Sequence, residues 1–308
     1  MSQYLLLKKL RVQNANALSS PFTFGFPAVT AFMGFAHRIQ REFNPTNDPD
    51  SFLCAGVGIV SHQFTMQDYQ EGYNRCLKIT ANPTEKEESL DKFDKKGEYH
   101  PMERPSFIEE GRCHLTISLL LEIENLPSSN DRFLQKIRNL LASHLKLAGG
   151  DILYRPDLEK ENIRLIQDEA TNFRQLIPGY ALVERKDLMV KAMQAGQDAL
   201  DALYDALVVK HQCNQDEQDA VIWQSQREHE GWIVPIATGF HALTPAAFAE
   251  QQRDAETPHR FAEAVVTLGE FKMPLPSRFP KGFKDLMWRY QQQGDLYLCT
   301  QNANQDSV

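Results

Sequence analysis

The chain has 308 residues, of which 42% are hydrophobic and 24% charged, with a net charge of −8 and a pI near 5.6. No apolar run approaches the ~18–20 residues that a membrane-spanning helix needs, and no signal peptide or membrane partner is expected. Five scattered cysteines without a CxxC pair argue against a zinc site or a disulfide framework, and they favour the reducing cytoplasm. The acidic balance also argues against a free-standing nucleic-acid binder, which is usually basic.

The N-terminal elements are predicted from hydrophobic periodicity. Residues 4–15 alternate as a strand, with Leu10 and Val12 on one face and Lys9 and Arg11 on the other. A polar loop over residues 14–21 follows, and apolar residues then recur at helical spacing over residues 28–43. Arg38 and Arg41 lie outside this apolar stripe.

The next segment contains a long protrusion between two strands. We expect strands at residues 54–64 and 112–122, a polar protrusion at about 65–110, a helix at 130–147 and a short strand at 151–154. Within the protrusion, residues 75–80 and 106–108 suit the two sides of a hairpin. Strand, helix, strand, strand, helix, strand is the ferredoxin-like order used by RNA-recognition domains.

The fold class is therefore predicted as α+β, with a ferredoxin-like palm at residues 1–160, an inserted hairpin thumb, and a C-terminal region at 161–308. In that region we expect strands at 177–183 and 232–236. Helices are expected at 187–209, 260–268 and 284–292.

No enzyme signature is present, and no cofactor or metal is expected. Gly56-Val-Gly58 lacks the third glycine of a dinucleotide fingerprint. His62 and His114 leave one catalytic alternative open, because metal-independent RNA cleavage needs a general acid and base near the 2′-hydroxyl.

Two features are compatible with phosphate binding. The predicted sheet brings together Lys9, Arg11, Arg38, Arg41 and Arg112, which form either a phosphate-binding face or a solvated surface. The Gly149-Gly150 pair either lets the backbone approach a phosphate or simply ends the preceding helix.

Seven segments in register resemble one known family. They are residues 6–21 (LLKKLRVQNANALSSP) with 24–27 (FGFP), then 56–60 (GVGIV), 109–115 (EEGRCHL), 147–153 (LAGGDIL), 177–183 (IPGYALV), 231–236 (GWIVPI) and 256–261 (ETPHRF). Together they resemble the second Csy subunit family, the Cas-five-type RAMP component of the type I-F CRISPR surveillance complex. The resemblance spans nearly the whole chain.

The resemblance implies a non-catalytic subunit that holds the 5′ handle of the guide RNA (crRNA). It also implies that the subunit pairs with the large Csy subunit, abuts the first repeated backbone subunit, and belongs to a complex that binds target DNA. Two alternatives remain: a RAMP-type endoribonuclease that processes repeat RNA, and a structural adaptor with protein contacts only.

Site residues are chosen from the matching segments and from the elements beside them. We expect Asn14, Asn16, Ser19 and Ser20 to hydrogen-bond base edges or 2′-hydroxyls, and Phe22 or Phe24 to stack on a base. Phosphates are assigned to Lys9, Arg11, Arg38, Arg104, Arg112, Gly149 and Gly150, with Arg253 and Arg260 as further candidates.

Overall fold

The first half of the chain follows the predicted element order in the computed structural model, which describes residues 3–301 except 79, 82–91, 94–97, 101–106, 109, 128, 144, 168–169, 216–220 and 253. Strand β1 (Gln3–Asn16) leads through a small hairpin, β2 (Leu18–Ser20) and β3 (Thr23–Phe24), into helix α1 (Val29–Phe43) and strand β4 (Leu53–Met66). After the protrusion come β11 (Arg112–Glu124), α2 (Asn130–Ser143), β12 (Lys146–Leu147) and β13 (Gly150–Ile152). The predictions for residues 4–15, 28–43, 54–64 and 112–122 are confirmed, whereas the helix predicted to reach residue 147 ends at Ser143.

These strands form one end of a large sheet, in the order β13-β1-β11-β4, and each neighbouring pair is antiparallel. Leu10 lies opposite Ile117 and Val12 opposite Leu115, so their side chains share the face that packs against α1 and α2. A bulge at Lys8 and Lys9 interrupts the pairing, and Lys9 has a φ of 50°. The alternation of apolar and polar residues in β1 can therefore be recognised in the sequence only after the bulge.

The second half differs from the prediction in several elements. Its strands and helices are α3 (Pro156–Glu159), β14 (Ile163–Gln167), β15 (Tyr180–Glu184), α4 (Lys186–Gln194), α5 (Ala199–Leu207), β16 (Lys210–Gln215), β17 (Val221–Gln226), β18 (Ile233–Ala242), β19 (Ala262–Lys272), β20 (Met287–Gln293) and β21 (Leu296–Thr300). The helices predicted at residues 260–268 and 284–292 are wrong, because residues 262–268 belong to β19 and residues 287–292 to β20, which follows a short 3-10 helix (Gly282–Leu286). The strands predicted at 177–183 and 232–236 are present as β15 and β18.

The single helix predicted over residues 187–209 is two helices. Gly196, with a φ of 102°, turns the chain after α4. Asp198 then starts α5, because its carboxylate accepts a hydrogen bond from the Asp201 N–H at 2.8 Å. A left-handed glycine followed by an acidic N-cap residue is a common way to end one helix and begin another.

Strand β4 joins the two halves. Within the described residues, β4, β15, β19, β18, β21 and β20 pair in that order, and β20 returns to β4, which closes a ring of strands. Gly56 favours this closure, since a Cβ there would lie 3.1 Å from Met287 Cβ and 3.3 Å from the Trp288 carbonyl oxygen of β20. The Gly56-Val-Gly58 segment therefore serves strand packing. Because strands of both halves share one sheet, the division at residue 160 stays a prediction.

Two main cores lie on opposite sides of this sheet. One is built from β1, β11, α1 and α2, and it includes Leu7, Phe32 and Ile117. The other includes Tyr4, Phe173 and Phe283, which cover the second face. The protein is thus a mixed α/β structure on a large sheet, in which every described pairing is antiparallel.

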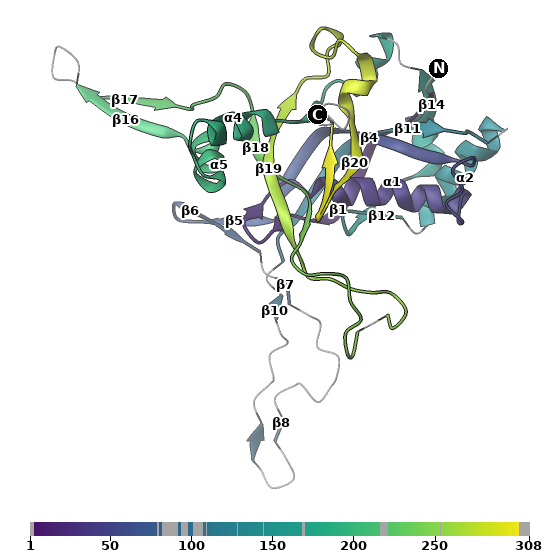
Figure 1. The fold of residues 1–308 in the computed structure, drawn as a ribbon, viewed down its shortest axis with the longest axis horizontal. Coiled ribbons are helices and arrows are strands. Elements are labelled where there is room, and N and C mark those ends of the chain that lie inside the picture. The colour runs from purple at the N-terminus through teal and green to yellow at the C-terminus, as the bar shows by residue number, and fades with distance from the viewer. Residues whose placement is uncertain are drawn as a thin grey trace.

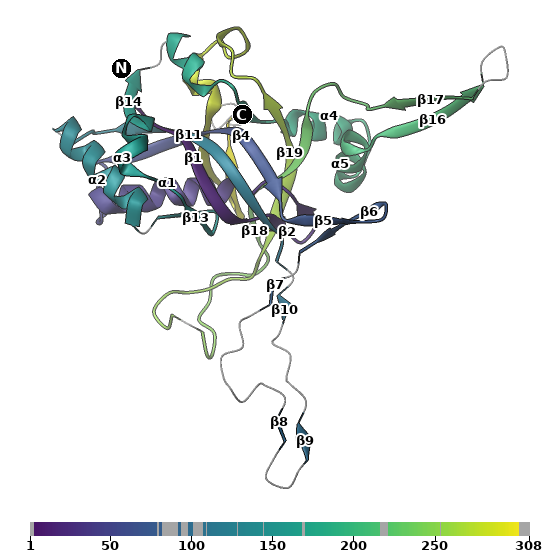
Figure 2. The ribbon, with the colours of Figure 1, turned by 180° about the vertical axis from the view of Figure 1, so that it is seen from behind.

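Three hairpins extend from this body (Figure 1). The β16–β17 hairpin projects beyond α4 and α5, and β5 (Asp68–Glu71) pairs with β6 (Asn74–Leu77) nearby. In the predicted protrusion, β7 (Thr80–Ala81) pairs with β10 (Phe107–Ile108), and β8 (Lys92–Phe93) with β9 (Tyr99–His100) (Figure 2). The hairpin predicted between residues 75–80 and 106–108 is confirmed only in part, because Thr80 pairs with Ile108 whereas residues 75–77 pair with β5. None of the described helices combines the length and hydropathy needed to cross a membrane.

Candidate nucleic-acid interface

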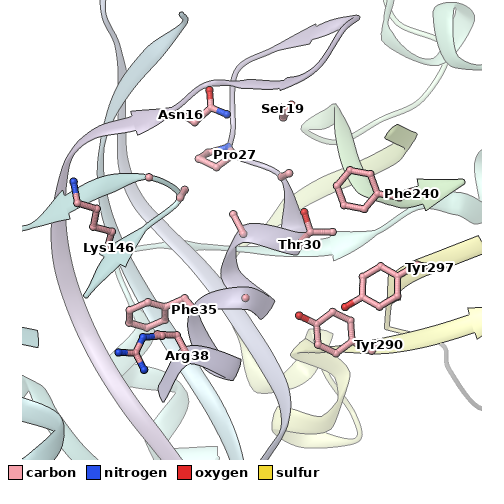
Figure 3. Close-up of a pocket in the computed structure, with 15 residues that line it drawn as sticks. Asn16, Ser19, Pro27, Thr30, Phe35, Arg38, Lys146, Phe240, Tyr290 and Tyr297 are labelled. Atoms are coloured by element: carbon pink, nitrogen blue, oxygen red, sulfur yellow. The ribbon is translucent and has the colours of Figure 1, made fainter. Parts of the chain in front are cut away.

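An open groove of about 670 Å³ lies along the N-terminal half of helix α1. Four of the predicted site residues line it: Asn16, Ser19, Arg38 and Gly149. They come from the end of β1, the β2–β3 hairpin, α1 and the β12–β13 turn, so the groove exists only in the folded chain. Figure 3 shows Lys146 and Arg38 on one side of α1 and three aromatic rings on the other.

The two cations of the groove are Arg38 and Lys146. Their side chains are 52% and 63% exposed. Arg38 pairs with Glu42 one turn along α1 at 2.5 Å, and Lys146 pairs with Asp151 across its hairpin at 3.1 Å. Such exposed pairs contribute little stability, so both cations are available to an arriving phosphate. Among the described residues that line the groove there is no carboxylate.

The first turn of α1 forms part of the groove floor. Ala28, Thr30 and Ala31 line it, and Ala28 offers no side-chain cap to the helix. No acidic residue lies in this first turn. The N–H groups at the start of the helix and the positive end of its dipole therefore favour an anion at this position.

Three partly exposed rings form the opposite wall: Phe240 of β18, Tyr290 of β20 and Tyr297 of β21. The rings of Tyr290 and Tyr297 lie 5.1 Å apart at 34°. Burial and the contact with Tyr297 raise the pKa of Tyr290 far above its ordinary value, so its phenol stays neutral. Exposed ring faces beside neutral hydroxyls are suited to stacking and hydrogen bonding with unpaired bases.

The predicted loop residues already make local hydrogen bonds. The Asn16 side chain bonds Leu18 N–H and C=O, both at 3.0 Å, and Ser19 Oγ lies 2.8 Å from Thr23 Oγ1. Ser20 is only 5% exposed, and its hydroxyl lies 2.7 Å from Thr23 Oγ1. Ser20 therefore shapes the hairpin, whereas Phe22 at its tip is 86% exposed and lines neither the groove nor another described cavity.

The two glycines of the Gly149-Gly150 pair have different roles, and neither ends α2. Gly149 has a φ of 76° and forms the β12–β13 turn at the edge of the groove. A Cβ on Gly150 would lie 2.5 Å from the Gln13 carbonyl oxygen, so Gly150 lets β13 approach β1 closely. Only Gly149 is exposed where a phosphate can reach it.

The predicted basic face is divided between the two sides of the sheet. Arg11 and Arg112 lie on the face that carries Thr116, away from α1, which bears Arg38 and Arg41. The expectation that these five cations meet is therefore wrong, because a helix packed on one face of a sheet cannot reach the other. Arg11 instead pairs with Glu159 at 3.4 Å.

A polar cluster lies on that second face, where β1 ends. Asn14, with a φ of 56°, accepts a hydrogen bond from Gln67 Nε2 at 2.6 Å, and Gln67 Nε2 lies 3.2 Å from His114 Nε2. The Arg112 guanidinium donates to the Asn14 carbonyl at 3.1 Å and pairs with Glu110. Since Asn16 pairs with Arg112 in the sheet, this cluster and the groove flank the same strand end.

The remaining predicted basic residues lie elsewhere. Arg260 is in the connection between β18 and β19, where it pairs with Asp295 at 3.6 Å and does not line the groove. Arg104 and Arg253 lie outside the described residues.

The candidate catalytic histidines are held by other groups. His62 Nδ1 bonds the Pro178 carbonyl oxygen and Nε2 lies 2.6 Å from Ser118 Oγ, so both ring nitrogens are engaged. Burial lowers the pKa of His62, which disfavours the protonated form that a general acid needs. Across the described parts of the chain, no group of three or more metal-ligating side chains comes together.

Sequence reasoning missed Lys146, Phe240, Tyr290 and Tyr297. The helix expected at residues 284–292 does not pair Tyr290 with a neighbouring strand, whereas in the structure Tyr290 lies opposite Cys299 of β21. The available signal was the turn Gly294-Asp295 between two aromatic segments, which is typical of a hairpin. Nothing in one sequence indicated that this hairpin faces α1.

Comparison with known proteins agrees with the resemblance drawn from the seven segments. The family profile described as CRISPR-associated protein (Cas_Csy2) matches residues 5–299 of this chain. A protein of Pseudomonas aeruginosa (strain UCBPP-PA14), named CRISPR-associated protein Csy2, is 33% identical over 328 aligned residues. The alignment covers 96% of this chain and 93% of that relative.

Proposed function

Because the chain belongs to the Csy2 family of CRISPR-associated proteins, we propose that it is a non-catalytic subunit of a type I-F CRISPR surveillance complex that holds the 5′ handle of the guide RNA. The groove along α1 carries this proposal. It combines two exposed cations, an uncapped helix start and three partly exposed rings, with no carboxylate among its described lining residues. Phosphates and bases of a single strand need both kinds of group.

The fold supports the same assignment. In our proposal β1, α1, β4, β11, α2 and β13 form a ferredoxin-like palm, because their chain order and their sheet order β13-β1-β11-β4 suit that arrangement. The paired strands β7 and β10 begin the thumb inserted between β4 and β11. The C-terminal strands close the ring and supply the aromatic wall of the groove.

The proposed binding mode uses both sides of the end of β1. Phosphates contact Arg38, Lys146 and the N–H groups at the start of α1, and bases stack on Tyr290, Tyr297 or Phe240. The polar cluster around Asn14 and Arg112 extends the surface onto the second face. The acidic net charge is compatible with this binding mode, because the cations are concentrated locally and partner subunits contribute others.

Partner contacts are proposed at surfaces outside the groove. The large Csy subunit and the first backbone subunit are the expected protein partners, and target DNA is held by the assembled complex in the cytoplasm. Exposed apolar side chains on β17, including Ile222 and Trp223, provide one surface that a protein partner can cover.

The state of His62 favours the non-catalytic assignment over a RAMP endoribonuclease. A metal-independent nuclease needs a general acid and a general base near the RNA, and histidine is the side chain that most often serves. His62 has both nitrogens bonded within the protein and a lowered pKa. In our proposal His62 therefore stabilises the junction of β4 and β11 instead of cleaving RNA.

The test is co-purification of the full chain with the large Csy subunit and a type I-F guide RNA. The Arg38→Glu/Lys146→Glu double variant should lose guide RNA and keep its protein partner. Binding of an isolated handle RNA is also measured against salt concentration. Each phosphate contact on a single strand adds about 0.7 to the slope of log affinity against log salt, so losing two contacts should make the slope of the double variant about 1.4 shallower than that of the unmodified protein.

A matched control is the Arg132→Glu/Lys191→Glu double variant, which reverses two exposed cations on α2 and α4 that do not line the groove. It should keep its RNA. The Lys9→Glu/Arg11→Glu/Arg112→Glu triple variant tests the second face separately. If neither the groove double nor the triple variant loses RNA, the adaptor alternative gains support, and cleaved repeat RNA would support the endoribonuclease.

A further inference from the structure

A second cavity, of about 360 Å³, lies between the outer end of β4 and the start of β18, and we call it the aromatic slot. Its walls include Phe24, Phe64, Tyr180 and Trp232, whose side chains are 50%, 38%, 41% and 54% exposed. The rings of Trp232 and Tyr180 meet edge to face with centroids 5.5 Å apart. Large, partly exposed rings that surround a cavity indicate a place where a flat ligand displaces water.

Polar groups lie among these rings. Gln63 and Ser61 line the slot, and within the described part of the chain neither side chain has a hydrogen-bond partner. The lining residues described include no carboxylate and no lysine or arginine, so the slot itself is close to neutral. An aromatic ligand with donors and acceptors on its edge matches this combination better than an aliphatic side chain does.

Cations lie close to the slot. The backbone N–H of Lys9 donates to Ser118 Oγ at 2.9 Å, and that hydroxyl lies 2.6 Å from His62, a lining residue. The charges of Lys9 and Lys8 are near enough to contribute to the lowered pKa of His62. A neutral slot with positive charge beside it suits a base whose phosphates remain outside.

One chain segment lines both the slot and the groove. Phe24, Gly25 and Phe26 line the slot, and the next two residues, Pro27 and Ala28, line the groove. A single strand that lies along α1 can therefore pass over this segment and place one base among the rings.

We propose that the aromatic slot binds one unstacked nucleobase of the same single-stranded RNA, with Trp232 as its stacking platform and Gln63 and Ser61 reading the base edge. The assignment rests on the proposed function and extends it to a base-binding subsite. Gly111 is a positioning residue in it, because a Cβ there would lie 2.6 Å from the Phe24 ring. Phe24 thus keeps its place only while residue 111 is a glycine.

The experiment uses the full chain and single-stranded RNAs copied from the 5′ handle, each with 2-aminopurine at one position. Stacking quenches 2-aminopurine, so one position should lose fluorescence on binding. Trp232→Ala should abolish that quenching and weaken RNA binding roughly 5- to 150-fold, the range expected for one stacked base. Trp232→Phe should restore both within about threefold.

Tyr204→Ala is the matched control, since Tyr204 is an aromatic residue that is 64% exposed on α5 and lies outside the slot. It should leave quenching and affinity unchanged. The groove variant Arg38→Glu/Lys146→Glu is titrated in parallel. If that variant loses RNA while Trp232→Ala does not, the slot proposal is overturned and the proposed function stands; if neither variant loses RNA, both fail. If Trp232→Ala releases the large subunit in the absence of RNA and leaves RNA affinity intact, the slot binds protein, which also overturns the proposal.

Discussion

Gly239 is the position where the closed ring of strands is most sensitive to a single added atom. In Gly239→Ala the new Cβ would lie 2.1 Å from the Tyr297 carbonyl oxygen and 3.0 Å from Leu298 Cα. Both neighbours are backbone atoms of β21, so no rotamer change relieves the contact. Strands β18 and β21 must separate locally, where Gly239 pairs with Leu298 and Phe240 with Tyr297.

The magnitude follows from overpacking and from weakened strand pairing. Overpacking costs about 1–3 kcal/mol, and each weakened backbone hydrogen bond adds about 1 kcal/mol, so we expect a loss of about 2–4 kcal/mol of unfolding free energy. An unfolding entropy of about 2.1 cal/mol/K per residue over 308 residues converts this to a decrease in Tm of roughly 3–6 °C. Differential scanning calorimetry measures the change directly.

Gly34→Ala is the control with the same chemical change. Gly34 lies within α1, its φ is not positive, and a Cβ there has no described atom within 4 Å. This variant should raise Tm by roughly 1 °C, because alanine is favoured over glycine in a helix by about 1 kcal/mol. An unchanged or raised Tm for Gly239→Ala would refute the close approach of β18 and β21.

Three further predictions follow from local geometry. Asp198→Ala should lower Tm by roughly 1–3 °C, because the N-cap hydrogen bond of α5 is lost. Asp198→Asn should keep most of the stability, because asparagine is also a good N-cap residue. Because the pKa of His62 is lowered in the folded state, the unfolded chain binds a proton first as the pH falls below about 6.5, and the unfolding free energy should fall. Urea titrations between pH 7 and 5 measure this decrease in unfolding free energy. In His62→Gln the contribution of residue 62 to the decrease should be absent. Burial raises the pKa of Cys113 and Cys299 to about 12, so at pH 8 a thiol reagent should label the exposed Cys213 rapidly and these two only after unfolding, as read by mass spectrometry of peptides.

Local pattern predicted the palm well. The alternation at the start of β11 and the 3-4 spacing of α1 each encode one buried face, and that face is set by residues close together in the chain. The order of these elements, and the segments shared with the Csy2 family, were likewise available from the sequence. The bulge at Lys9 was not, since it hides the alternation of β1 until Leu10.

Strands β19 and β20 show where local pattern failed. Each becomes a strand because partners distant in the chain satisfy its backbone: β19 pairs with β15 and β18, and β20 pairs with β4 and β21. The residues within one strand do not indicate which distant strands it will pair with. The sequence shows glycines at 56 and 58, but only the structure shows that they leave room for β20 to pack against β4.

The candidate site divides in the same way. The sequence by itself identified Asn16, Ser19 and Gly149 within family-like segments and Arg38 on the polar side of the predicted helix 28–43, and the groove contains all four. Only the tertiary structure separated Arg38 from Arg11 and Arg112, because the sheet lies between them. Only the tertiary structure places Lys146, Tyr290 and Tyr297 in the groove, because the packing of β20 and β21 beside α1 decides which side chains line it.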